Sequence, residues 1–172
     1  MTGFRLDKGG LIDRRRKINF RYNGQQITGF KGDTIASALM ASGHMLVGRS
    51  FKYHRPRGIM SAGVEEGGAL FNTGDGAARI PNVKGTVTEI SEGLRVYSQN
   101  VFPSPEFDLG AVNGLIAPFI TAGFYYKTFM GPFANTKFWM VCERFIRRAA
   151  GLGRASREAD PSTYDIANGF CD

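Results

Sequence analysis

Cysteine and histidine are scarce in this chain. Its 172 residues include two cysteines, Cys142 and Cys171, and two histidines, His44 and His54. So few sulfur and imidazole ligands exclude a disulfide scaffold and a four-ligand zinc site of the usual spacing. The low cysteine content is typical of a protein from a reducing compartment.

Long apolar runs and nucleotide-binding fingerprints are also missing. No segment approaches the run of about 20 apolar residues that a membrane span requires. The N-terminus carries Arg5, Asp7 and Lys8 where a leader peptide would be apolar. The chain contains neither a glycine-rich dinucleotide fingerprint nor a phosphate-binding P-loop. We therefore expect a cytoplasmic protein that makes no membrane contact.

Positive charge, by contrast, is in excess. The chain has 22 basic and 15 acidic residues, a net charge of +7. This balance favours an anionic partner such as a nucleotide, a nucleic acid or an acidic subunit. Most of the basic side chains fall within three segments, 14–17, 49–57 and 144–157. The length and a hydrophobic content of 42% fit one domain with a real core, alone or with an appended arm.

The first hundred residues combine a hairpin, a helix and short strands. Residues 17–30 alternate apolar and polar side chains around Asn23-Gly24, the strongest short hairpin signal. Residues 34–42 then carry apolar side chains at helical spacing. Strand-like segments follow at residues 69–71, 83–90 and 94–97. This order predicts an α+β protein with a β-grasp fold, in which one helix packs on a small mixed sheet.

The chain changes character after that. Residues 101–132 are irregular and rich in Phe, Pro and Gly, and the aromatic segment 123–132 suits either core packing or the docking of a partner. Residues 137–150 predict an amphipathic C-terminal helix with Cys142 as a buried thiol on its apolar face. The expected domains are a β-grasp domain at residues 1–100 and, at residues 101–172, a docking arm with the helix and a connector.

One segment has the composition of a binding site. Within an expected loop at residues 45–58, aromatic Phe51 and Tyr53 alternate with basic Arg49, Lys52, Arg55 and Arg57. Guanidinium groups bind phosphate or carboxylate in bidentate fashion and aromatic rings stack on planar ligands. A nucleotide cofactor, RNA and an acidic protein surface therefore all suit this segment. A solvated loop suits it equally well, with its charges balanced within the chain by Glu65, Glu66 and Asp75.

Seven sequence blocks occur in an order that is specific to one family. They resemble the N-terminal region of the α subunit of heterotetrameric sarcosine oxidase and span nearly the whole chain. The blocks are GGLIDR (9–14), GDTIASAL (32–39), VGRSFKYHRPRG (47–58), SAGVEE (61–66), AGFYYKTFM (122–130), IRRAAGLG (146–153) and DPSTYD (160–165). In that family the region resembles a ferredoxin-type 2Fe-2S β-grasp domain and precedes a dinucleotide-binding domain. The resemblance thus implies a fragment or separately expressed piece of a larger subunit.

The same resemblance allows the cluster ligands to be checked. Plant-type 2Fe-2S sites use three closely spaced cysteines and a distant fourth. The pair Gly63-Val64 matches the Gly-Val pair common inside that loop and sets the register. The ligand positions then fall on Met60, Glu65 and Gly68, with the fourth near Thr86. None is a cysteine, so the resemblance implies a β-grasp scaffold that lacks its metal site.

An interface role is what the resemblance implies about function. The family's holoenzyme oxidatively demethylates sarcosine and uses FAD, FMN and NAD, but its amine-oxidising residues lie outside this region. We therefore expect no cofactor in this chain and no catalysis by it alone, within an oxidoreductase complex that acts on secondary amines. The expected partners are the remainder of the α subunit, with its dinucleotide-binding domain, and the β, γ and δ subunits. A nucleic-acid-binding module built on residues 49–57 and a stand-alone electron-transfer subunit are the alternatives.

Overall fold

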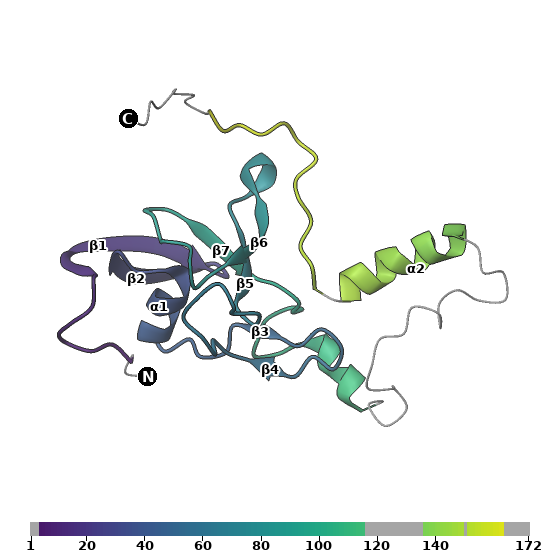
Figure 1. The fold of residues 1–172 in the computed structure, drawn as a ribbon, viewed down its shortest axis with the longest axis horizontal. Helices are drawn as coiled ribbons and strands as arrows, with labels where there is room; N and C mark the ends of the chain where they lie inside the picture. The colour runs from purple at the N-terminus through teal and green to yellow at the C-terminus, as the bar shows by residue number, and fades with distance from the viewer. Residues whose placement is uncertain (1–3, 116–135, 150, 164–172) are drawn as a thin grey trace, which may run out of the picture.

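A mixed five-stranded sheet forms the centre of the molecule. The computed structural model describes residues 4–115, 136–149 and 151–163. The strand order is β2-β1-β7-β5-β6, with β1 antiparallel to β2 and parallel to β7. The strands are β1 (Asp13–Tyr22), β2 (Gln25–Lys31), β5 (Leu70–Thr73), β6 (Ile80–Lys84) and β7 (Arg95–Ser98). Figure 1 shows the helix α1 (Ile35–Ala41) lying against the β1–β2 end of this sheet, so the predicted β-grasp class is confirmed.

The β1–β2 hairpin forms at the predicted turn. Asn23 and Gly24 both have positive φ, 48° and 85°, as a tight hairpin turn with primed geometry requires. Strand alternation then turns Phe20, Tyr22 and Ile27 into the core. The first strand begins at Asp13, earlier than the predicted residue 17, and so includes the basic segment 14–17. The register of its pairing with β2 shifts between Asp13 and Lys17.

The helix α1 is short but well capped. The Thr34 hydroxyl accepts the N–H of Ser37, and the Ser37 hydroxyl accepts the N–H of Thr34, which completes a capping box. Its Ile35 and Leu39 side chains are fully buried and belong to the core cluster that also holds residues of β1, β5 and β7. The helix predicted at residues 34–42 is therefore confirmed.

Two predicted segments differ from the structure. Residues 45–58, expected as a loop, contain a two-stranded antiparallel ribbon of β3 (Gly48–Arg49) and β4 (Pro56–Arg57). The strand expected at residues 83–90 is wrong, because β6 ends at Lys84. Beyond it, the backbone from residue 85 to residue 90 hydrogen-bonds mainly around the start of α1, through N–H groups of Ile35 and Ala36 among others. Tertiary hydrogen bonding thus replaces sheet pairing in that stretch.

Two 3-10 helices and one long helix complete the elements of the described residues. The 3-10 helices are η1 (Gly76–Ala78) and η2 (Leu109–Gly114), and the long helix is α2 (Thr136–Ala149), where the sequence predicted a helix at residues 137–150. Cys142 is only half-buried, so its prediction as a buried thiol is wrong, and the neighbouring Val141 is more than half exposed. The aromatic segment 123–132 lies outside the described residues. Among those that are described, no helix has the length and apolar character to cross a membrane.

Candidate functional site

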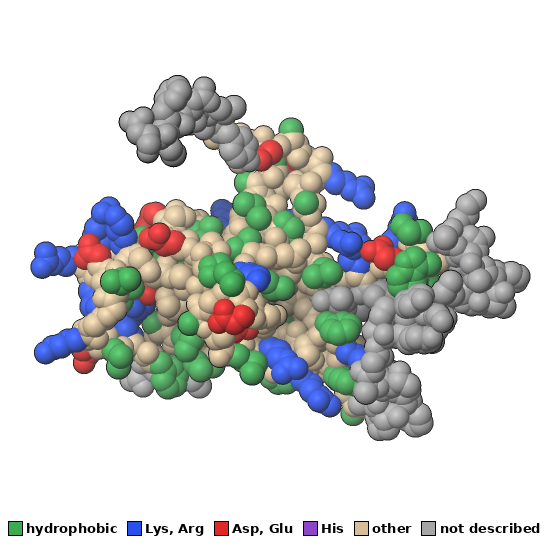
Figure 2. All heavy atoms as spheres, in the orientation of Figure 1, with side chains coloured by type: hydrophobic (Ala, Val, Ile, Leu, Met, Phe, Trp, Pro, Cys, Tyr) green, Lys and Arg blue, Asp and Glu red, His purple; other side chains and the backbone are tan. Residues whose placement is uncertain are grey.

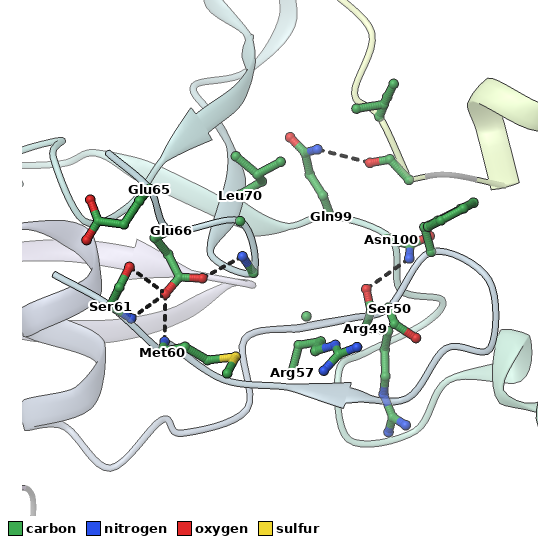
Figure 3. A pocket seen from close by; sticks show the side chains of 16 residues that line it. Arg49, Ser50, Arg57, Met60, Ser61, Glu65, Glu66, Leu70, Gln99 and Asn100 are labelled. Carbon is green, nitrogen blue, oxygen red and sulfur yellow. Dashed lines mark hydrogen bonds between the residues drawn. The ribbon is translucent and has the colours of Figure 1, made fainter. Parts of the chain in front are cut away.

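A pocket of about 520 Å³ separates two segments that the sequence singled out. On one side lies the basic ribbon, residues 48–57, and on the other the 60–68 loop, which holds three of the four inferred cluster-ligand positions. Figure 3 shows the Glu66 carboxylate turned toward Ser61 on the loop side, with Arg49 and Arg57 across the pocket. Chain that follows α2, at Gly151 and Leu152, completes the lining.

Glu66 is buried and saturated with hydrogen bonds. Only 3% of the residue is exposed, and its carboxylate accepts the backbone N–H groups of Met60 (2.6 Å), Ser61 (2.7 Å) and Gly68 (2.5 Å). Burial alone would raise the pKa of this carboxyl, but these hydrogen bonds outweigh burial and hold the pKa below its ordinary value. The alternative in which Glu66 balances the charges of the basic loop is therefore wrong, and its neighbour Glu65 is exposed.

The inferred ligand positions do not fit an iron–sulfur cluster. Met60 is 80% exposed, and the Thr86 hydroxyl donates a hydrogen bond to the Gly63 carbonyl at 2.8 Å. Within the described part of the chain, no group of three or more His, Cys, Asp or Glu residues is placed to hold a metal ion. Cluster iron requires thiolate ligands, and the positions that should supply them carry a thioether, a carboxylate, a hydrogen atom and a hydroxyl.

Arg49, the first of the four predicted anion contacts, is committed inside the molecule. Its guanidinium donates to the backbone carbonyls of Pro105 (2.8 Å), His54 (3.1 Å) and Glu106 (3.2 Å). These bonds fasten the basic ribbon to residues 105–106, which lie more than fifty positions along the chain. The role that the structure gives Arg49 is therefore the positioning of the ribbon.

The other three predicted contacts lie in two different places. Arg57 is exposed and lines the pocket. Lys52 Nζ and the Arg55 guanidinium instead lie over the Tyr53 ring, 5.3 Å and 4.9 Å from its centroid. The Lys52 ammonium is also buried without a hydrogen-bond acceptor among the described residues. The four cations therefore do not form one site.

The acidic residues proposed as internal counter-charges do not pair with the ribbon in the described structure. Glu66 binds backbone N–H groups, and Glu65 accepts the N–H of Gly63. Asp75 accepts hydrogen bonds from Tyr97 and Arg95, which lower the pKa of its carboxyl. The exposed cations Arg55 and Arg57 thus have no acidic partner among the described residues.

A histidine at the tip of the ribbon is hydrogen-bonded to an aspartate outside it, and this pair anchors the ribbon. The sequence analysis did not predict the pair. His54, at a positive φ of 51°, places Nδ1 2.5 Å from Oδ2 of the buried Asp108. The Asp108 carboxylate also accepts the N–H groups of Phe102 (2.9 Å) and Gly110 (3.3 Å). A Cβ on Gly110 would come within 2.3 Å of the imidazole ring, so glycine is required there. No local pattern in the sequence links residues so far apart.

A second buried carboxylate, that of Asp33, joins the N-terminal segment to α1. It accepts hydrogen bonds from both terminal nitrogens of Arg5 (3.1 and 2.6 Å), from the N–H of Phe30 (2.8 Å) and from the Ser37 hydroxyl (2.8 Å). Burial would raise the pKa of Asp33, but these donors, Arg5 first, hold it below its ordinary value.

Comparisons with known proteins agree with this structure. Residues 15–101 match the family described as 2Fe-2S iron-sulfur cluster binding domain. The sarcosine oxidase subunit alpha of Rhizobium meliloti is 53% identical over 173 aligned residues, which cover all of this chain and 17% of that protein. The Corynebacterium sp. (strain U-96) sarcosine oxidase subunit alpha is 47% identical over 38% of this chain and 7% of its own length.

Among solved structures, L-proline dehydrogenase from P. horikoshii aligns with a TM-score of 0.40 and 16% identity, over 51% of this chain and 16% of that one. The chain spans less than a fifth of the length of the curated relatives named above. The resemblance drawn from the sequence blocks, to the N-terminal region of sarcosine oxidase α subunits, is confirmed. The chain therefore belongs to the 2Fe-2S iron-sulfur cluster binding domain family, in a form without cluster cysteines, and is a homologue of sarcosine oxidase α subunits.

Proposed function

We propose that this chain is the N-terminal structural and interface module of the α subunit of a flavin-dependent sarcosine oxidase. The observation that carries the proposal is the 53% identity to such a subunit over the whole chain. The missing cluster ligands argue in the same direction, because a domain without them does not transfer electrons through a cluster. The module positions other parts of the enzyme and is not catalytic alone.

Under this proposal the chemistry of the complex lies elsewhere. FAD, FMN and NAD would be held by the remainder of the α subunit and by the β, γ and δ subunits, in a cytoplasmic complex that oxidises a secondary amine. The β-grasp domain spans residues 1–100 and the docking arm spans residues 101–172. The hydrogen bonds from Gln99 to the Gly151 carbonyl (3.0 Å) and from the Gly153 N–H to Asn82 (3.0 Å) support an arm that returns to the domain.

The surface suited to the interface is where the ribbon meets the start of the arm. Five apolar side chains there are each more than half exposed: Phe102, Phe107, Leu109, Val112 and Leu115. In the view of Figure 2, basic side chains project from the lower edge of the molecule, beneath the place where Figure 1 labels β3 and β4, with apolar side chains close by. Exposed apolar area beside unpaired charge is typical of a protein–protein contact.

Within that interface we propose that anionic groups of the assembled enzyme, either a cofactor phosphate or an acidic surface, contact Arg57 at the pocket and Lys52 and Arg55 around Tyr53. Arg57 is exposed, Arg55 has no acidic partner among the described residues, and the buried Lys52 ammonium lacks an acceptor there. An incoming anion would supply charge-assisted hydrogen bonds to these groups. Arg49, which the sequence grouped with them, would hold the ribbon in place.

Co-expression of the tagged chain with the remaining subunits tests the proposal. We expect those subunits to co-purify with the wild-type chain and to be lost from the double variant Arg55→Gln/Arg57→Gln. The matched control is Lys31→Gln, an exposed cation on β2 away from the ribbon. If none of the subunits co-purifies with the wild-type chain, the proposal that the chain is an interface module is refuted.

The nucleic-acid alternative has weaker support in the structure. Two cations already lie over the Tyr53 ring, so this ring is not free to serve as a stacking platform for a base. A gel-shift assay with single-stranded DNA and RNA at low salt provides the comparison. Salt-sensitive binding that Arg55→Gln/Arg57→Gln abolishes would favour nucleic acid over the interface.

A further inference from the structure

The family to which this chain belongs binds an iron–sulfur cluster, yet the 60–68 loop lacks the ligands for one and is held by hydrogen bonds of its own. In cluster proteins, backbone N–H groups converge into a concave site that suits an anion, and iron–sulfur sites use such concavities. Here the N–H groups of Met60, Ser61 and Gly68 converge in the same manner. In this chain the group that accepts these hydrogen bonds is a side-chain carboxylate that belongs to the loop itself.

We propose that Glu66 is the built-in anion of this loop, performing the loop-organising role that the cluster has in other members of the family. This inference goes beyond the proposed function, because it concerns how the domain folds without the group that defines its family.

The hydrogen bonding of Glu66 involves both carboxylate oxygens. Oε2 accepts the N–H groups of Met60 and Ser61 and, at 3.4 Å, the Ser61 hydroxyl, while Oε1 accepts the N–H of Gly68. A buried carboxylate without such donors would be strongly destabilising. Among the described residues no cation pairs with Glu66, so backbone N–H groups and the Ser61 hydroxyl compensate its charge. The lowered pKa of the carboxyl agrees with this arrangement.

Two of the N–H donors belong to inferred ligand positions, Met60 and Gly68. At Gly68 a Cβ would lie 3.0 Å from Glu66 Oε1 and 3.0 Å from the Gly58 carbonyl oxygen. A cysteine at residue 68 would therefore start its side chain against the carboxylate. In this conformation a thiolate ligand at position 68 would crowd the Glu66 carboxylate and the Gly58 carbonyl, one of which would have to shift, and it would also repel the carboxylate charge. Glycine at 68 avoids both effects.

The side chains at two further inferred ligand positions, Glu65 and Thr86, are also engaged in hydrogen bonds within the protein. The Thr86 hydroxyl donates to the Gly63 carbonyl, and Glu65 folds back so that its carboxylate accepts the Gly63 N–H. A Cβ on Gly63 would come within 2.3 Å of that carboxylate. Hydrogen bonds within the loop and to Thr86 thus tie together the region that cluster ligation would otherwise organise.

Amide hydrogen exchange on the full chain tests the proposal. In Glu66→Ala we expect the amides of Met60, Ser61 and Gly68 to exchange about tenfold faster or more, since each loses a charge-assisted acceptor. Formate, supplied as a small carboxylate, should restore part of the protection, while sodium chloride at equal ionic strength should not. The matched control is Glu65→Ala, which removes the adjacent but exposed carboxylate.

Three results would overturn the inference: unchanged protection in Glu66→Ala, an equal loss at the same amides in Glu65→Ala, or equal rescue by chloride. If Glu66→Ala does not fold, a titration of the wild-type amides decides. The signals of Met60, Ser61 and Gly68 should move together with a midpoint below the usual glutamate value of about 4.3. A midpoint at or above that value would show that these amides do not report a stabilised carboxylate.

Discussion

The β-grasp body and the basic ribbon differ in what their charged groups do. In the body, the carboxylates of Asp33 and Glu66 are buried and receive several hydrogen bonds each. In the ribbon, Arg55 and Arg57 are exposed and have no acidic partner among the described residues. Removing an enclosed carboxylate leaves its buried donors without a partner and lowers stability, whereas a charge left at the surface contributes little to stability and is available to a partner. Changes in the body should therefore alter unfolding, and changes in the ribbon should alter assembly.

The largest effect is expected in the core of the body. Leu39 is fully buried between α1 and the sheet, so Leu39→Ala should lower the free energy of unfolding by about 2–5 kcal/mol. Chemical denaturation of the full chain measures it. Leu11→Ala, which changes a fully exposed leucine, should stay within about 0.5 kcal/mol. Similar losses for the two variants would mean that α1 is not part of the core.

The next effect concerns the junction between body and ribbon. Asp108→Ala removes the acceptor of His54 and of two backbone N–H groups. It should lower the free energy of unfolding by about 2–3 kcal/mol because buried donors lose their partner. Hydrogen exchange should locate the loss at the tip of the ribbon. Asp7→Ala, a change of an exposed aspartate, serves as the control. Unaltered exchange at the tip in Asp108→Ala would show that the ribbon is held by other contacts.

A smaller, pH-dependent effect is expected at Asp33. Because its pKa is lowered in the folded state, Asp33 stabilises the protein at pH values above the unfolded value of about 3.9, and this contribution is lost as pH falls through the folded pKa. Asp33→Asn should lower the free energy of unfolding by about 1–2 kcal/mol at neutral pH. It should also reduce the fall of that free energy with decreasing pH. Unfolding measured from pH 7 to pH 3 gives both values. Parallel curves for wild type and variant would contradict this account.

The smallest effect on stability is expected in the ribbon. Arg55→Gln/Arg57→Gln should change the free energy of unfolding by less than about 0.5 kcal/mol, as for ordinary surface substitutions. The same variant should weaken assembly with the other subunits. Arg49→Gln provides the contrast, because it removes donors to three backbone carbonyls and should lower stability. A marked loss of stability in the double variant would place these cations in an internal network.

Features that depend on neighbouring residues could be predicted from the sequence. The Asn23-Gly24 turn and the helix behind Thr34 formed where the pattern placed them, because turn dihedrals and caps are set within a few residues. The missing cluster cysteines also required only the sequence and a register. The length of the first strand and the end of β6 were not predictable in this way, since the cross-strand partners decide them, Lys31 opposite Asp13 and Leu70 opposite Lys84.

The candidate site shows the limit most clearly. Four cations in nine residues looked like one anion-binding loop, but Arg49 turned toward backbone carbonyls, Lys52 and Arg55 toward Tyr53, and Arg57 toward the pocket. Composition counts charges but does not give their directions. Those directions depend on which distant acceptors the fold supplies, here the carbonyls of residues 105 and 106.

Composition, turn residues and ordered blocks were therefore enough to identify the β-grasp class, the family and a domain without cluster ligands. Only the tertiary structure showed that Glu66 lies inside the 60–68 loop and that Asp108 holds His54. The physical reason is that a carboxylate can be buried only where donors converge on it, and donors converge only after the chain has folded.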